Sequence, residues 1–286
     1  PYIPLMTARE FIKMHGLGND FVIVDARVRP LSVTEGGTQN LSDRHTGIGF
    51  DTLITIEPDS QADVRVGIFN ADGSRVGACG NAMRCVARLL LDENNQQLSI
   101  RTDAGMLEAW RSSDNDDHFA VDMGPARTDW QDIPLTQECD TAHVPLSRGD
   151  LTDPVAVNMG NPHAVFFLDE VETVAIETLG PDLEHDPIFP EKANIGIAQV
   201  VGPDTLRLRV WERGVGLTLA CGTGACAAAV AAHRRGLTGR NVKVIVDGGS
   251  LNIEWRENGH VVMSGPAEES FRGMVSEDAF SATEHR

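Results

Sequence analysis

The sequence is short of positive charge and of aromatic side chains, and each shortage argues against a class of protein. Its 286 residues contain 24 Lys and Arg against 42 Asp and Glu, which gives a net charge of −18. Nucleic-acid binding needs a basic face and docking on anionic membranes needs basic clusters, so we expect neither partner. Aromatic residues make up only 5% of the chain, but a hydrophobic content of 41% is enough for ordinary buried cores.

The sequence also lacks the patterns that indicate a disulfide framework, a membrane span or a pyridoxal phosphate site. Five cysteines form an odd number at low density, and no apolar run approaches the length of a membrane span. Pro1 to Glu10 has neither the basic region nor the apolar region of a secretory signal, so we expect free thiols in a reducing cytoplasm. The three lysines, Lys13, Lys192 and Lys243, lie outside any glycine-rich phosphate-binding context, so a Schiff-base cofactor is not expected.

Two short segments each place a cysteine at the start of a helical pattern. One is ACGTGACAAAVAA, from Ala220 to Ala232, and the other is ACGNAMRC, from Ala78 to Cys85. A cysteine at a helix N-terminus faces unpaired backbone N–H groups and the positive end of the helix dipole. Both effects lower the pKa of a thiol, so we expect Cys79 and Cys221 to provide thiolate near neutral pH.

The two segments belong to an internal duplication. Cys221 lies 142 residues after Cys79, and the same interval relates other residues upstream of the two cysteines. It joins Asn19 to Asn161, Thr52 to Asn194 and Asn70 to Glu212, and weaker echoes (LEAW and NIEW, then GPA twice) follow downstream. A repeat of this length predicts two structural units of like topology.

We therefore predict an α+β fold of two pseudo-symmetric domains, each with mixed strands around one central helix. The N-terminal half is expected to span residues 1–127 and the C-terminal half residues 128–265, with residues 266–286 possibly returning to the first half. Under this hypothesis a pseudo-two-fold axis relates the halves, and Cys79 and Cys221 face each other across one cleft.

Local patterns predict the individual elements. Helices are expected from Cys79 to Leu91, from Val171 to Leu179 and from Cys221 to His233. Residues 128–152 form a polar stretch that is expected to join the halves, and the polar tail from Ser276 onward is expected to be poorly ordered. Strands are expected at 11–14, 21–25, 52–57, 64–70, 98–109, 118–123, 164–168, 194–201, 205–211, 242–246, 251–255 and 261–263.

Other interpretations of the cysteines remain open from the residues alone. Cys85 and Cys226 lie inside the helical patterns, and both are interpreted as buried core thiols. The gaps from Cys79 to Cys85 and from Cys221 to Cys226 do not match the close spacing of structural zinc, so no metal site is predicted. A redox disulfide between the two turn cysteines would lack CxxC spacing but is geometrically conceivable.

Polar residues near the cysteines point to recognition of an amino acid. An asparagine in a turn usually serves the backbone, but Asn19, Asn70, Asn161 and Asn194 share the duplicated register. Asparagine offers both a donor and an acceptor. A guanidinium such as that of Arg213 can bind a carboxylate through two hydrogen bonds, and a carboxylate such as that of Glu212 can accept from an ammonium group.

Four segments together resemble the signature segments of the diaminopimelate epimerase family. They are HGLGNDFVIVD, FNADGS followed by ACGNAMRC, GNPHAV, and ERG followed by LACGTGACA. The resemblance runs in order from about Phe11 to about Gly273. Thr52 departs from it, standing where the family commonly has glutamine, and so does Leu217, where the family often has glutamate.

The resemblance implies a role for each candidate residue. Cys79 and Cys221 are the implied acid and base thiols, and His163 and Glu212 are implied to tune them. A homodimer and a cofactor-free reaction are likewise implied. The implied substrate contacts are Asn19, Thr52, Asn70, Asn161, Asn194, Glu212 and Arg213, together with the backbones of Gly80, Asn81, Gly222 and Thr223 at the reacting carboxylate.

The resemblance implies an isomerase that converts LL-diaminopimelate to meso-diaminopimelate without a cofactor, for lysine and peptidoglycan precursors, and we expect it in the cytoplasm. Removal and return of an α-proton on opposite faces needs a thiolate on one side and a thiol on the other. A proline- or hydroxyproline-type racemase is the alternative within the fold. A thiol-redox or amino-acid-binding protein without turnover is the alternative from another class.

Overall fold

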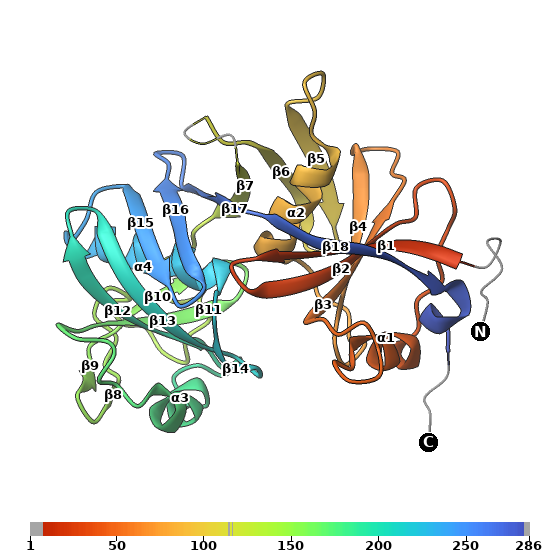
Figure 1. The fold of residues 1–286 in the computed structure, drawn as a ribbon. Helices are drawn as coiled ribbons and strands as arrows, with labels where there is room; N and C mark the ends of the chain where they lie inside the picture. The colour runs from red at the N-terminus through yellow and green to blue at the C-terminus, as the bar shows by residue number, and fades with distance from the viewer. Residues whose placement is uncertain (1–7, 114, 116, 283–286) are drawn as a thin grey trace. The chain divides into compact units, whose positions relative to one another are not determined.

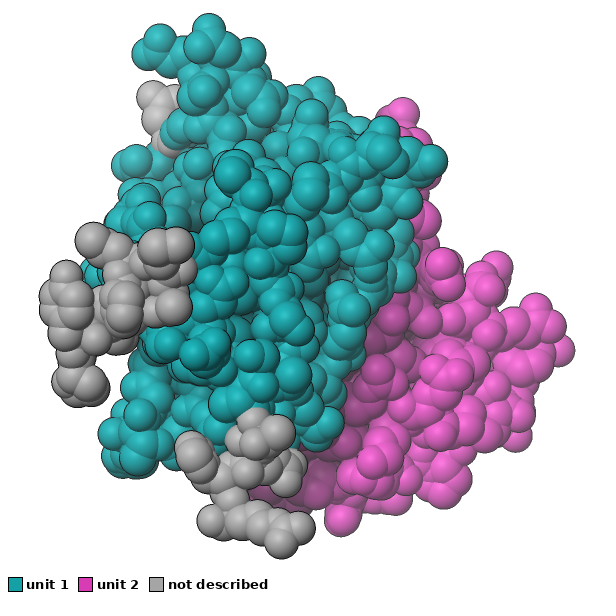
Figure 2. Space-filling view, turned by 90° about the vertical axis from the view of Figure 1, so that its right-hand side faces the viewer, with its two compact units in different colours: residues 1–121, 266–286 teal, residues 122–265 magenta. Residues whose placement is uncertain are grey.

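The structure is a computed structural model that describes residues 8–113, 115 and 117–282. In this described part, the residues up to Val121 and from Pro266 onward form one compact unit, and Asp122–Gly265 form the other (Figure 2). Within the same part of the chain, no helix is both long and apolar enough to span a membrane. The two units are called unit 1 and unit 2 below.

Unit 1 is built on a mixed sheet that ends in the returning C-terminal segment (Figure 1). Strands β2 and β3 are parallel, as are β4 and β5, whereas the other neighbours are antiparallel. In spatial order its strands are β6 (Gly105–Arg111), β5 (Gln97–Thr102), β4 (Val64–Asn70), β3 (Thr52–Glu57), β2 (Asn19–Asp25), β1 (Ala8–Gly16) and β18 (Glu268–Ser276).

Unit 2 repeats the topology of β1 to β6, whereas β18 extends the sheet of unit 1 only. The parallel pairs of unit 2 are β11 with β12 and β13 with β15, which correspond to β2 with β3 and β4 with β5. Short β14 (Gly216–Thr218) pairs with β13, and β8 (Ser147–Arg148) pairs with β9 (Leu151–Thr152). The strands in spatial order are β10 (Val155–Asn158), β11 (Pro162–Phe167), β12 (Asn194–Gly202), β13 (Thr205–Glu212), β15 (Asn241–Val246), β16 (Gly249–Trp255) and β17 (His260–Pro266).

The helices occupy matching places as well. Helix α2 (Gly80–Leu90) connects β4 to β5, and α4 (Gly222–Arg234) connects β13 to β15. Helix α1 (Glu35–Ser42) lies between β2 and β3 in the chain, and α3 (Ile176–Glu184) lies between β11 and β12. Strand β7 (His118–Pro125) carries the chain out of unit 1. The predicted α+β class with like topology in the two units is confirmed.

The central helix of each unit is largely buried. In α4, every residue from Gly224 to Ala232 is buried, and alanine combines high helix propensity with room for close packing. In α2 the buried run extends from Gly80 to Ala87, and Arg88 at the far end donates to the carbonyl of Ala267.

Several expectations about the elements need correction. The single strand expected at 98–109 is two antiparallel strands, β5 and β6, joined by a turn at Asp103 and Ala104. The helix predicted at Val171–Leu179 begins instead at Ile176 and continues through Pro181 to Glu184. Residues 128–152 are packed onto unit 2, because their apolar side chains join its core rather than bridging the halves. These buried side chains are Ile133, Leu135, Val144, Leu146 and Leu151.

The C-terminal segment is also better ordered than predicted. Glu277–Phe280 form a 3₁₀ helix, η1, and the Phe280 side chain is fully buried against Phe11, Leu41 and Phe50. The backbone carbonyl of Phe280 accepts from Thr34 N at 2.9 Å. One large apolar side chain therefore anchors this end of the chain, although its neighbours in sequence are polar. Residues 283–286 of the predicted tail lie outside the described residues.

Candidate active site

Each unit presents one cysteine at the N-cap of its central helix. Cys79 precedes α2 with φ −147° and ψ 102°, and Cys221 precedes α4 with φ −105° and ψ 110°. Both residues are extended, so the chain turns into the helix immediately after the thiol. The first backbone N–H groups of a helix have no acceptor within the helix, and they point toward the N-cap side. Both thiols therefore lie beside a concentration of N–H donors.

The thiol of Cys221 is enclosed. It is only 4% exposed, and its Sγ accepts a hydrogen bond from Gly224 N at 3.3 Å and lies 3.6 Å from Thr223 Oγ1. A Cβ atom at position 224 would lie 3.2 Å from Sγ and 3.0 Å from a methyl group of Val210. A larger residue at position 224 would push the sulfur or Val210 back by a few tenths of an ångström, so glycine favours this close approach of the backbone to the thiol.

The expectation of a lowered pKa is wrong for Cys221. Burial raises the pKa of this thiol well above its ordinary value, and the negative charge of Glu212 raises it further. The hydrogen bonds from Thr223 and Gly224 act in the opposite direction but do not compensate. Cys221 thus rests as a neutral thiol, the form that can deliver a proton. Cys79 is half-buried, and no disulfide involves any of the five cysteines, all of which lie in the described part of the chain.

Glu212 lies at the C-terminal end of β13, where Asn70 lies at the end of β4 in unit 1. Its Oε1 accepts from Thr218 Oγ1 at 2.5 Å, which holds the carboxylate beside the segment that leads to Cys221. Glu212 also hydrogen-bonds with the Cys221 thiol. The structure therefore brings the predicted residues Glu212, Cys221 and Thr223 together.

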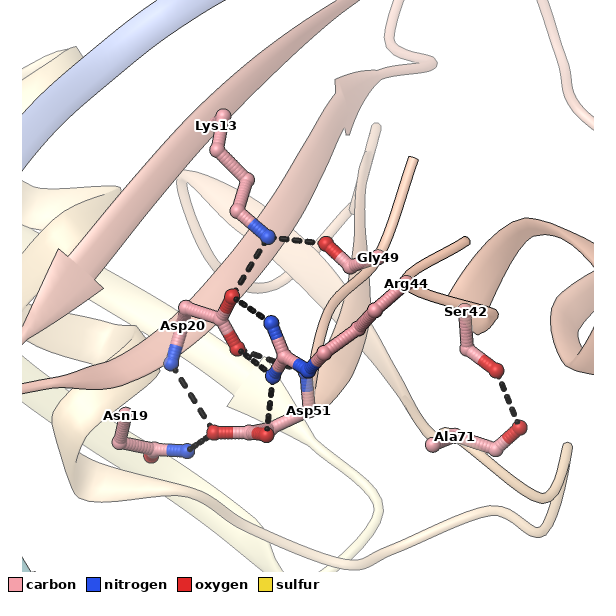
Figure 3. A network of polar contacts seen from close by, with 8 residues as sticks. All are labelled: Lys13, Asn19, Asp20, Ser42, Arg44, Gly49, Asp51 and Ala71. Carbon is pink, nitrogen blue, oxygen red and sulfur yellow. Dashed lines mark hydrogen bonds and ion pairs between the residues drawn. The ribbon is translucent and has the colours of Figure 1, made fainter. Parts of the chain in front are cut away.

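In unit 1 the asparagine side chains are connected to each other. Asn81, in the first turn of α2, donates to Asn19 Oδ1 at 3.3 Å, and Asn19 donates to Asp51 Oδ2 at 2.9 Å (Figure 3). Asn81 also accepts from Arg84 Nη1 at 3.0 Å. The start of β2 and the start of α2 are linked in this way. Two predicted contact residues from distant parts of the sequence thus form one polar surface.

Charged residues that the sequence did not single out support this surface. Asp20 accepts from Lys13 at 2.6 Å and from both terminal nitrogens of Arg44, and Arg44 also contacts Asp51 (Figure 3). Burial of Asp20 opposes its charge, but the hydrogen bonds from Arg44 and Lys13 hold its pKa well below its ordinary value. Lys13 also bonds the carbonyl of Gly49. The only sequence signal was the position of Asp20 next to Asn19.

Thr52 and Asn70 lie opposite each other on adjacent strands. They are paired in the antiparallel register of β3 and β4, and Thr52 is also aligned with Phe21 on β2. The Asn70 side chain donates to Ser74 Oγ at 3.1 Å, so the turn that follows β4 orients it. Thr52 is buried at 7% exposure, at the place that Asn194 occupies in unit 2.

In unit 2 a buried histidine links the asparagines. His163 on β11 is aligned with Asn194 on β12, and its Nε2 lies 2.9 Å from Asn161 Oδ1 and 3.4 Å from Asn194 Nδ2. Burial lowers the pKa of His163 to about 3, and the positive charge of Arg213 contributes. His163 is therefore neutral at physiological pH. In a neutral ring Nε2 can either donate to Asn161 Oδ1 or accept from Asn194 Nδ2, so in one tautomer it bonds only one of these amides. The neutral ring also carries no charge with which to stabilise a thiolate.

The Arg213 segment is held by its backbone. Arg213 N donates to Asn194 Oδ1 at 2.9 Å, and its guanidinium donates to the carbonyl of Glu191 at 2.8 Å. Gly214 follows with φ +74°, a left-handed conformation that favours glycine, and its N–H donates to Glu184 Oε1 at 3.0 Å. Glu184 was not predicted as a functional residue, because nothing in the local sequence distinguishes it from a surface glutamate.

The helix starts themselves are buried. Gly80, Asn81 and Gly222 are all buried, and Thr223 is half-buried. Within the described residues, no group of three or more His, Cys, Asp or Glu side chains is arranged to hold a metal ion. The chemistry that these elements can perform is proton transfer by thiols beside anion-binding helix ends. The expectation that the two thiols share one cleft remains a prediction.

The model of the family described as diaminopimelate epimerase matches residues 11–128 and 155–269. The diaminopimelate epimerase of Acidiphilium cryptum is 52% identical over 95% of this chain and 98% of its own length. This chain belongs to the diaminopimelate epimerase family. The diaminopimelate epimerase of Rhodospirillum centenum is also 52% identical, over 94% of this chain and 93% of its own length.

Solved structures place this member of the diaminopimelate epimerase family in a wider fold group. A phenazine biosynthesis protein of the PhzF family from Bacillus anthracis has a TM-score of 0.67 at 16% identity, covering 94% of this chain and 99% of its own. A hydroxyproline epimerase from Agrobacterium vitis, with bound trans-4-hydroxy-L-proline, has a TM-score of 0.66 at 14% identity, covering 96% and 94%. At these identities the likeness establishes the fold alone.

Proposed function

We propose that this chain converts LL-diaminopimelate to meso-diaminopimelate without pyridoxal phosphate, by a two-base mechanism. The observation that carries the proposal is membership of the diaminopimelate epimerase family, with 52% identity over 95% of the chain. The cysteine at the N-cap of each central helix supports it, because each thiol has the donors of a helix end beside it. The product would serve lysine and peptidoglycan precursor synthesis.

In the proposed reaction one thiolate removes the α-proton, and the electron pair of the broken C–H bond moves toward the substrate carboxylate. The opposite thiol then delivers its proton to the other face of the carbon and becomes the new thiolate. This mechanism requires the sulfur atoms of Cys79 and Cys221 on opposite faces of one carbon, with one thiol contributed by each of the proposed halves, 1–127 and 128–265. Because Cys221 is a neutral thiol, it is suited to deliver the proton in the direction of reaction in which Cys79 removes the α-proton.

The helix ends supply the electrostatic part of catalysis. We assign the N–H groups of Gly80 and Asn81, and those of Gly222 and Thr223, to the reacting carboxylate. Negative charge accumulates on this carboxylate as the proton leaves, and dipoles that are fixed in advance stabilise it without reorganisation. No electron-sink cofactor is needed in this scheme.

The rest of the substrate is assigned to the polar side chains of both units. Arg213 is proposed to bind the distal carboxylate and Glu212 the distal ammonium group, because the helix ends are committed to the reacting centre. His163 is assigned to orienting the asparagine that it bonds. Glu212 is assigned to keeping Cys221 protonated. The remaining proposed contacts are Asn19, Thr52, Asn70, Asn161 and Asn194.

We also propose that the protein is a homodimer and that it is located in the cytoplasm. Strand β18 is the last strand of the unit 1 sheet, and the free edge of such a strand can pair with a strand of a second copy. Sedimentation equilibrium would test the dimer, and a monomer mass at micromolar concentration would exclude it. Cell fractionation would test the location.

Turnover in deuterium oxide tests the mechanism. Early product is expected to carry deuterium at the inverted carbon while recovered substrate carries little, because the delivered hydrogen comes from a solvent-exchanged thiol. Replacing either Cys79 or Cys221 by Ala should abolish epimerisation. Cys85→Ala, one turn into α2 at a buried site, is the matched control and should remain active. Original hydrogen retained in the product would indicate a single base and refute the scheme.

A substrate panel tests the specificity. Arg213→Ala leaves a carboxylate unpaired in a closed site, which costs roughly 2–5 kcal/mol, and part of the loss should appear in turnover. Wild-type chain that racemises proline or alanine as fast as it epimerises diaminopimelate would favour the racemase alternative. Wild-type chain that binds diaminopimelate without optical change would favour a binding protein.

A further inference from the structure

Behind the Arg213 segment lies a buried carboxylate that the mechanism above does not use. Glu184, the last residue of α3, is only 4% exposed. Its two oxygen atoms accept one hydrogen bond each: Oε2 from the Trp211 indole N–H at 2.8 Å, and Oε1 from Gly214 N at 3.0 Å. The carboxylate therefore joins the residue before Glu212 to the residue after Arg213.

Helix α3 lies directly against the Trp211 ring. A Cβ atom at Gly180 would meet the indole at 2.5 Å, so only glycine permits this approach, and Gly216 lies against the other end of the ring. The backbone carbonyl of Glu184 accepts from Ala193 N at 3.2 Å, next to Asn194. Glu184 is thus fixed by its own backbone and touches both segments that hold Arg213.

A carboxylate suits this place for a simple reason. Both groups that face it are N–H donors, and a carboxylate offers acceptors only. Glutamine at the same position would present one acceptor and one amide group, so one of the two N–H donors would lose its acceptor. A buried donor without an acceptor is costly, and the turn would shift to satisfy it.

We propose that Glu184 is a positioning residue for the distal end of the substrate. It acts by fixing the backbone from Trp211 to Gly214, on which Glu212 and Arg213 are carried. The proposal rests on the assignment of these two residues to the distal carboxylate and ammonium groups. Epimerisation leaves the distal centre unchanged, so the segment that reads it must keep one geometry while the reacting carbon inverts.

A double-mutant cycle tests the proposal on the full chain. Glu184→Gln should raise KM for LL-diaminopimelate about tenfold, the effect of one lost buried hydrogen bond. Trp211→Phe removes the indole donor, so in the double variant the glutamine can turn its carbonyl oxygen toward Gly214 N. The double variant should therefore have a KM closer to that of Trp211→Phe alone. Glu177→Gln, at an exposed site on the same helix, is the matched control.

A second cycle asks whether Glu184 acts through Arg213. Glu184→Gln should cause a smaller loss in kcat/KM in the Arg213→Ala background than in the wild type, because one of the two groups it positions is already gone. Fully additive losses would overturn the proposal. A fall in kcat that matches a loss of folded protein, with KM unchanged, would also overturn it, since it would mark a purely structural role.

Amide hydrogen exchange separates this inference from the proposed function. The segment from Trp211 to Thr218 should exchange faster in Glu184→Gln than in the wild type. The double variant of Glu184→Gln with Trp211→Phe should regain protection. This readout needs no substrate. If exchange responds as expected and diaminopimelate is not turned over, the proposed function fails while the positioning contact stands. Unchanged exchange in Glu184→Gln would refute the positioning contact itself.

Discussion

His163 should make the protein lose stability in mild acid. Its pKa is lowered from 6.5 to about 3 in the folded chain, first by burial and then by Arg213, so the folded state does not take up a proton between these values. The unfolded chain does. Stability is therefore unaffected by this group above its unfolded pKa and is progressively lost as the pH falls below it.

The magnitude follows from the shift. Each pH unit in this window costs about 1.4 kcal/mol, so the group removes about 3 kcal/mol of unfolding free energy by roughly pH 4.5. His163→Gln keeps a hydrogen-bonding side chain but cannot titrate. Its stability at neutral pH will be lower through lost packing, yet the gap from the wild type should narrow by about 3 kcal/mol on acidification.

Urea unfolding of both proteins at several pH values between neutrality and about 4.5 measures this gap. Carboxylates also titrate in the range, but their contributions are common to the two proteins and cancel in the difference. An NMR titration should show the ring protons of His163 unmoved across the same interval. Parallel stability curves for the two proteins, or a ring that titrates near its ordinary pKa, would refute the buried neutral state and its role in orienting an asparagine.

Two further outcomes are expected from the sites described above. Burial and, after it, the charge of Glu212 raise the pKa of Cys221, so Glu212→Gln should lower that pKa and speed iodoacetamide labelling of the thiol. Peptide mass spectrometry measures the rate, and an unchanged rate would contradict the assignment. Phe280→Ala should cost about 3–5 kcal/mol in urea unfolding, because this fully buried ring anchors the C-terminal segment; a loss under about 1 kcal/mol would show that it does not.

Much of the fold could be predicted because the chain contains the same unit twice. The interval of 142 residues places Asn19 and Asn161 at matching strand starts, and Cys79 and Cys221 at the N-caps of matching helices. Small residues and glycine around each cysteine marked the helix starts without reference to distant contacts. These signals depend only on neighbouring residues, so they can be recognised in the sequence without knowledge of the tertiary structure.

The residues that were missed depend on contacts between distant segments. Glu184 meets Trp211 and Gly214 across the fold, and Asp20 meets Arg44 across an intervening helix. Nothing in their own neighbourhoods separates them from solvated charges. The pKa of Cys221 was mispredicted for a related reason: the helix end was visible in the sequence, but the burial that outweighs it was not. Tertiary environment decides such properties.

The duplication also explains why the two thiols differ in their surroundings. The backbone repeats, but the thiol of Cys221 caps its helix and that of Cys79 does not cap α2. Unit 1 surrounds its helix start with charged residues that support Asn19, whereas unit 2 uses a neutral His163 and the carboxylate of Glu212.

A substrate with two similar ends makes this divergence useful. LL- and meso-diaminopimelate are not mirror images, because only one of two stereocentres inverts. Two identical half-sites would not distinguish the reacting end from the distal end, so one half must acquire residues for a second carboxylate. Arg213 in unit 2 is the residue proposed for this role, and its counterpart in unit 1 is Ala71, which carries no charge. Under the proposed mechanism, the two retained helix starts carry out the proton transfer, and the residues that differ at the strand ends fix which end of the substrate reacts.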